Sequence, residues 1–188
     1  MIEWVASLIT SVGLGLGAGV NAYATFLVFG LLSRFYPLLF QGDLATFFAS
    51  TPVLVTVGVL YVIEFAADKF PGLDHIWDAI HTFIRPAAGA LVAFASTTPE
   101  MPQGVAILAA VLGGGAALGS HLTKSAIRAT STATTGGIAN PALSVGEDVF
   151  AIGQSLLAVF LPFVFLALMA AFLLALMAWL LRPRRGRI

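Results

Sequence analysis

The sequence predicts an all-α polytopic membrane protein, and three observations lead to that fold class. The chain of 188 residues is 59% hydrophobic and has a mean hydropathy of +0.98. Only 10% of its residues are charged, against roughly 25% in an ordinary soluble domain. Several runs without a charged residue are long enough to cross a bilayer, which takes about 20 residues of helix. A soluble fold could not bury this much apolar surface, so we expect a single integral membrane domain with five or six membrane segments.

The uncharged runs place these segments along the chain, at residues 4–33, 44–63, 101–120 and 149–181. As one helix the last run would be about 50 Å long, more than one hydrocarbon thickness. It is therefore expected to break at Pro162, as a kink or as a hairpin. Helices are expected over residues 4–35, 44–68 with a start at Leu44 or Pro52, 73–96 with a kink at Pro86, 103–130, 145–160 and 162–181.

Two stretches carry local signals besides hydrophobicity. The first segment contains GLGLGAGVNAY, with glycines at 13, 15, 17 and 19. These glycines indicate either close helix packing or an unwound stretch that exposes backbone carbonyls near Asn21 and Tyr23. Residues 130–144 are rich in small polar residues and glycine and are expected to form a loop, after which Ser144 and Glu147 would make a capping box.

A weak internal repeat suggests two halves, residues 1–100 and 101–181. At an offset of 100, Gly13, Gly15 and Gly19 correspond to glycines and Asn21 corresponds to His121. At an offset of 70, the start of the third helix corresponds to that of the fifth. Many transporters consist of two such halves with the site between them, but chance similarity between glycine-rich membrane segments is the alternative.

The ionisable residues are few and clustered, although charges inside a membrane are energetically unfavourable. Spacings of three and four place Glu64 with Asp68, Asp74 with Asp78, His81 and Arg85, and His121 with Lys124 and Arg128 on one helix face each. The acidic faces of the second and third helices are expected to neutralise a basic face of the fourth. The clusters are Glu64, Asp68 and Lys69; Asp74, Asp78, His81 and Arg85; His121, Lys124 and Arg128; and Glu147 with Asp148.

These clusters, with Asn21 and Tyr23, are the candidate pathway of a small transporter or channel for a cation, a proton or a small charged solute. The carboxylates would bind or relay the cation, and the histidines could relay protons because they titrate near neutral pH. Arg85, Lys124 and Arg128 would balance the carboxylates or hold an anionic solute.

Other functions stay open at this point. Buried ion pairs could serve only structure in a membrane scaffold, and an intramembrane lipid-modifying enzyme using His and Asp is conceivable. Enzyme motifs such as a Walker loop, G-x-S-x-G or a dinucleotide fingerprint do not occur, so we expect no enzyme and no cofactor. A divalent cation could be held jointly by Glu64, Asp68, Asp74, Asp78 and His81, although no compact ligand motif supports a metal site.

The basic tail RPRRGRI predicts a cytoplasmic C-terminus by the positive-inside rule. It carries Arg182, Arg184, Arg185 and Arg187, four of the nine Lys and Arg residues. The tail is expected to set topology and not to bind nucleic acid. The N-terminus lacks a basic region and a cleavage site, so the first helix is expected to be retained. The expected partners are the lipid bilayer and a small ion or charged solute, and a chain this small often forms a homodimer.

The charged stretches also resemble a known family. EFAADKFPGLDHIWDAIHTFIRPAAGA, HLTKSAIR and NPALSVGEDV are similar, in this order, to segments of the bacterial membrane proteins grouped as domain of unknown function 4126. The resemblance covers most of the chain and implies a small polytopic protein of the bacterial inner membrane. It implies no activity, substrate or catalytic residue.

Overall fold

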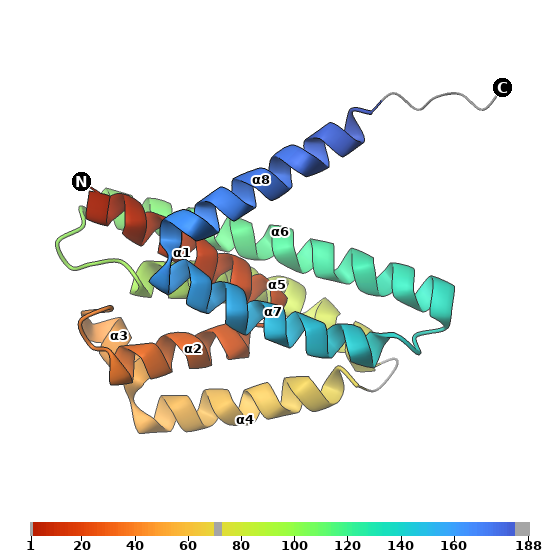
Figure 1. Ribbon diagram of the computed structural model, residues 1–188. Helices are drawn as coiled ribbons and strands as arrows, with labels where there is room; N and C mark the ends of the chain where they lie inside the picture. The colour runs from red at the N-terminus through yellow and green to blue at the C-terminus, as the bar shows by residue number, and fades with distance from the viewer. Residues whose placement is uncertain (1, 70–72, 183–188) are drawn as a thin grey trace.

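The computed structural model describes residues 2–69 and 73–182, and of Leu73, Asp74 and His75 only the backbone. Every regular element in these ranges is a helix, and the helices run back and forth along a common direction (Figure 1). They are α1 Ile2–Val20, α2 Ala22–Phe35, α3 Asp43–Ala49, α4 Thr51–Ala67, α5 Leu73–Ala95, α6 Gln103–Thr135, α7 Asn140–Phe160 and α8 Pro162–Leu180.

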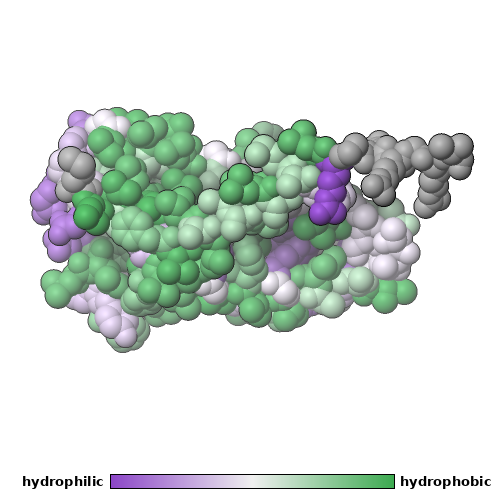
Figure 2. Space-filling view, turned by 45° about the horizontal axis from the view of Figure 1, so that its top comes forward, coloured by the Kyte–Doolittle hydropathy of each residue, from purple (hydrophilic) through white to green (hydrophobic). Residues whose placement is uncertain are grey.

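The helices confirm the membrane class. In the described residues α1, α6, α7 and α8 are long and apolar enough to cross a membrane, and α3 with α4, bent by 63° at their junction, would make a fifth span. The protein is therefore a polytopic helical membrane protein, with a span count at the lower end of the prediction. Figure 2 shows a largely hydrophobic face with one small hydrophilic patch recessed in it.

Helix α1 lies at the centre of the bundle, packed against α5, α6 and α7. Its glycines allow backbones to meet: a Cβ added to Gly15 would lie 2.5 Å from the Cα of Gly113 on α6. A Cβ on Gly89 of α5 would lie 2.4 Å from the Cβ of Ala117. The close-packing interpretation of the glycine-rich stretch is thus correct for Gly15.

The predicted break near Asn21 is also present. Asn21 has φ −147° and ψ 106° and separates α1 from α2, which runs back in the opposite direction (Figure 1). The side-chain Oδ1 of Asn21 accepts the Ala24 N–H at 2.8 Å. In a continuous helix that N–H would bond to the carbonyl of Val20. This carbonyl instead accepts a hydrogen bond from Lys124 Nζ at 3.1 Å.

The second break lies at Leu161, before Pro162, where φ is −137° and ψ 58°. Helix α8 turns back from the end of α7 and diverges from the bundle (Figure 1). Pro162 therefore marks a hairpin and not a kink. Only Phe165 of α8 is buried among its described residues, so the rest of this apolar helix is available to lipid.

The predicted loop over residues 130–144 is too long, because only residues 136–139 form a turn between the helices. Helix α6 continues past Thr130 to Thr135, and the hydroxyls of Thr134 and Thr135 bond to carbonyls one turn back, at 2.9 and 2.8 Å. Such back-bonding gives these hydroxyls partners within the helix itself. The helix ends at Gly136, whose φ of +64° suits glycine.

The predicted capping box is wrong as well. Helix α7 begins at Asn140, with Pro141 in its first turn, so Ser144 lies inside the helix and not at its N-cap. Ser144 is fully buried. Its hydroxyl accepts from Lys69 Nζ at 2.9 Å and faces Asp68 Oδ2 at 3.5 Å.

Candidate functional site: a buried ionic network

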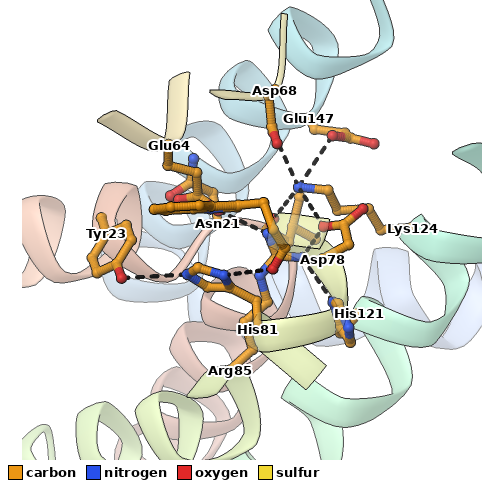
Figure 3. Close-up of polar contacts among 12 residues, drawn as sticks. Asn21, Tyr23, Glu64, Asp68, Asp78, His81, Arg85, His121, Lys124 and Glu147 are labelled. Carbon is orange, nitrogen blue, oxygen red and sulfur yellow. Dashed lines mark hydrogen bonds and ion pairs between the residues drawn. The ribbon is translucent and has the colours of Figure 1, made fainter. Parts of the chain in front are cut away.

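Charged side chains from α5, α6, α7 and the end of α4 meet inside the bundle (Figure 3). Each of the seven fully buried ones is at most 7% exposed. They are Glu64, Asp68, Asp78, Arg85, Lys124, Arg128 and Asp148.

The basic face of α6 meets acids from three other segments. Lys124 Nζ lies 3.5 Å from Asp68, 3.9 Å from Asp78 and 3.3 Å from Glu147. Arg128, one turn further along α6, pairs with Asp68 at 2.7 Å and with Glu147. These pairs confirm the prediction that acids at the end of α4 and on α5 neutralise the basic face of α6. Glu147 from α7 is a further acid in this group.

Arg85 forms a second group of ion pairs inside the bundle. Its Nη2 atom lies 2.7 Å from Glu64 Oε1, and its Nη1 atom lies 3.3 Å from Asp78 Oδ1. Asp78 also lies 3.7 Å from Arg128. Asp78 therefore connects the Arg85 pair to the cations of α6.

His121 is held as a neutral imidazole by its neighbours. Arg85 NH1 lies 2.7 Å from Nδ1, and a guanidinium can only donate. The other ring nitrogen, Nε2, lies 2.9 Å from the Thr82 hydroxyl, which itself donates to the Asp78 carbonyl. Nε2 thus carries the proton, and the neutral His121 ring connects Arg85 to Thr82 by a hydrogen bond on each nitrogen.

His81 carries its proton on the opposite nitrogen. Its Nδ1 lies 2.8 Å from the Trp77 carbonyl, which can only accept. Its Nε2 lies 3.3 Å from the Tyr23 hydroxyl, and the Trp77 ring stacks on the imidazole at 4.8 Å. Tyr23 and His81 therefore form a bonded pair beside the ion pairs.

Asp148 stands apart from these ion pairs. Its Oδ1 accepts a hydrogen bond from Asn21 Nδ2 at 2.7 Å, while its Oδ2 is buried without a hydrogen-bond partner. The side chain is 5% exposed. Among the described acids of the network, it is the one without an ion pair.

The charges of the described network do not balance. Four buried carboxylates face three buried cations, and the half-buried Glu147 and Lys69 add one charge of each sign. His121 is neutral in this arrangement. The network therefore has one more acid than cations, and Asp148 is the acid left over.

The sequence matches one known protein family over most of its length. The family model described as domain of unknown function (DUF4126) matches residues 8–183. The chain is a member of DUF4126. No curated protein and no solved structure matches it.

In this DUF4126 protein, the buried ionic network and the side chains beside it include nearly all of the predicted pathway residues. Asp74 is the exception, because its side chain lies outside the described residues. Lys69 lies at the edge, over the Phe65 ring at 3.6 Å. Of the basic tail, Arg184, Arg185 and Arg187 lie outside the described residues.

Several groups of the site were not among the residues predicted from the sequence. Thr82 and Ser144 bind charged or histidine side chains, and the Val20 carbonyl binds Lys124. Thr82 follows His81 directly and lies one turn before Arg85, so its position beside the charged stripe could have indicated a role. Ser144 was predicted to cap a helix, so its position on the buried face of α7 was not foreseen.

A joint metal site is not formed by the residues that the structure describes. No three His, Asp or Glu side chains among them are placed to hold one ion. Two cavities, of about 550 and 260 Å³, are lined by other residues and touch neither Asp78 nor His121. The network thus consists of direct contacts between side chains.

Proposed function

We propose that this protein is a small transporter or channel that moves a proton or another small cation through the buried ionic network. The single observation that carries the proposal is Asp148, a buried carboxylate with one free oxygen and no ion pair among the described residues. A charge inside a membrane costs about 2–4 kcal/mol on insertion scales. A group kept there without a cationic partner suits binding of a mobile cation.

The alternative of a purely structural network accounts for the other acids but not for Asp148. Glu64, Asp68 and Asp78 each have a cationic partner within 3.3 Å. Buried pairs of this kind can stabilise a fold without transporting anything. Asp148 adds a buried carboxyl group without a cationic partner, which a scaffold does not need.

The broken helix supports transport. Asn21 places its side-chain amide against Asp148, and the Val20 carbonyl, which has no helix N–H to bind, accepts a hydrogen bond from Lys124. Discontinuous helices inside the membrane commonly form the ion and substrate sites of transporters, because their ends supply unpaired backbone groups.

The proposed location is the bacterial cytoplasmic membrane, with the C-terminus in the cytoplasm. The basic tail supports that orientation. In Figure 1 the end of α8 lies on the same side of the molecule as the end of α4 and the α6–α7 connection. Asp68 follows the end of α4 directly. The ionic network would then lie nearer the cytoplasmic face. A homodimer is compatible with the exposed apolar helix α8.

The test is ion flux in proteoliposomes under an imposed membrane potential, measured separately for protons, sodium and potassium. The wild type should carry one of these ions faster than empty liposomes, and Asp148→Asn should abolish that flux while the protein still folds. Asp43→Asn is the matched control, because Asp43 is exposed at the start of α3. Absence of any wild-type flux would refute the proposal, and full flux in Asp148→Asn would remove Asp148 from the pathway.

A further inference from the structure

Lys69 differs from the other cations of the site because it takes part in no ion pair among the described residues. Each of the three buried cations pairs with two or more carboxylates. The Lys69 ammonium instead donates to Ser144 Oγ at 2.9 Å and lies 3.6 Å from the centre of the Phe65 ring. A lysine near a membrane surface usually extends its ammonium toward water. Ser144 is fully buried, so the ammonium of Lys69 points into the bundle.

The hydroxyl that Lys69 binds belongs to a polar stripe on the buried face of α7. Asn140, Ser144 and Asp148 are spaced by four residues, which places them on one helix face, and each is at most 5% exposed. The stripe begins at the first residue of α7, next to the α6–α7 connection. Ser144 lies about 6 Å along the helix axis from Asp148. Lys69 is therefore bound one turn before the acid that lacks an ion pair.

This position lies on the side of the molecule from which cytoplasmic ions would arrive in the proposed orientation. Lys69 comes two residues after the end of α4. That end, the α6–α7 connection and the end of α8 share one side of the molecule (Figure 1), and the basic tail follows α8 in the sequence. A cation that enters along the α7 stripe meets the Lys69 ammonium before it reaches Asp148.

The charge of Lys69 opposes a second cation at this distance. At an effective dielectric constant of about 20, two unit charges about 6 Å apart repel enough to weaken binding roughly 100-fold. The same force attracts the ammonium to Asp148, whose Oδ2 is buried without a hydrogen-bond partner. The lysine stem has four flexible carbons, so the ammonium can move from Ser144 toward Asp148 while the backbone stays in place.

We propose that Lys69 is a tethered competitor for the cation site and closes the cytoplasmic approach to Asp148. Its ammonium occupies the Ser144 position or pairs with Asp148, and a transported cation must displace it. The Phe65 ring stabilises the ammonium at the Ser144 position, because the face of an aromatic ring attracts a cation. The inference rests on the proposed function and adds the regulation of its site.

The first test removes the ammonium. Lys69→Met keeps a long side chain without the charge and should lower the concentration of transported cation that gives half-maximal flux. We expect a change of roughly tenfold, since water around the half-buried lysine screens part of the repulsion. A gain of flux at low cation concentration cannot result from misfolding. Arg182→Met is the matched control, because it removes a positive charge at an exposed site on the same side of the molecule, and it should leave flux unchanged.

The second test restores the charge. The chain contains no cysteine, so Lys69→Cys introduces a single thiol and should raise flux as Lys69→Met does. Aminoethyl methanethiosulfonate attaches an ammonium group to this thiol and should return flux to the wild-type level. Methyl methanethiosulfonate attaches a small neutral group and should leave the flux high.

The outcomes separate the two proposals. An unchanged or lower flux in Lys69→Met, with wild-type flux that still requires Asp148, would overturn the tethered competitor and leave the proposed function standing. Equal effects of the charged and the neutral reagent on Lys69→Cys would do the same. Absence of cation flux in the wild type and in both Lys69 variants would reject the function itself.

Discussion

Asn21 joins the break between α1 and α2 to Asp148 on α7: its amide nitrogen lies 2.7 Å from Asp148 Oδ1, and its oxygen caps the Ala24 N–H at 2.8 Å. The backbone bond fixes which end of the amide faces the carboxylate. The helix break thereby sets the position of the one described acid that lacks an ion pair. The two roles of Asn21 can be separated by substitution.

Asn21→Ser should retain most of the fold's stability but lose flux. Serine caps helices as well as asparagine does. Its single hydroxyl cannot accept the Ala24 N–H and also reach Asp148 to donate a hydrogen bond. Asn21→Ala should lose flux and about 1–2 kcal/mol of stability. Thermal unfolding in detergent and flux in liposomes measure the two effects. Equal stability loss in both variants would contradict the capping role.

Glu64 and Arg85 should prove strongly coupled in stability. Glu64→Leu leaves the Arg85 guanidinium, fully buried at 0% exposure, without its closest partner, which should cost about 3–5 kcal/mol. The double variant Glu64→Leu with Arg85→Leu should be more stable than Glu64→Leu alone. Unfolding of both singles and the double in detergent tests this. Arg34→Leu, at an exposed site, serves as the control; additive losses would mean that the pair is not coupled.

Gly15→Ala should disrupt the crossing of α1 and α6. The added methyl would lie 2.5 Å from the Cα and carbonyl oxygen of Gly113, and these backbone atoms cannot move without shifting a helix. We expect a loss of about 1–3 kcal/mol or more. Gly115→Ala, where a methyl meets nothing within 4 Å, should be harmless. The comparison is made by melting temperature, and similar melting of both variants would contradict the packing.

Asp78→Asn should abolish flux while the protein still folds and inserts. Asp78 connects Arg85 to Lys124 and Arg128 at 3.3–3.9 Å, and the amide keeps its size but not its charge. His121→Ala should likewise reduce flux, because it removes the neutral link between Arg85 and Thr82. Size-exclusion profiles establish folding in each case. Intact flux in both variants would show that the ionic network is not the path.

Much of this architecture could be predicted because it depends on local pattern. The scarcity of charge determined the membrane class, and spacings of three and four determined which charges share a helix face. Asn21 was identified through the glycines before it. The end of α6 was not predicted, since threonines that suggest a loop can also lie within a helix and bond back to its carbonyls.

The different partners of Glu147 and Asp148 could not be predicted from the sequence. The sequence determined that two adjacent acids enter the core on one helix, but neighbouring residues point about 100° apart around a helix axis. The rotation of α7 against α1 and α6 decides that Glu147 meets Arg128 while Asp148 meets only Asn21. That rotation follows from how close the small residues of three helices allow their backbones to come, which depends on contacts between segments distant in the chain and not on local spacing.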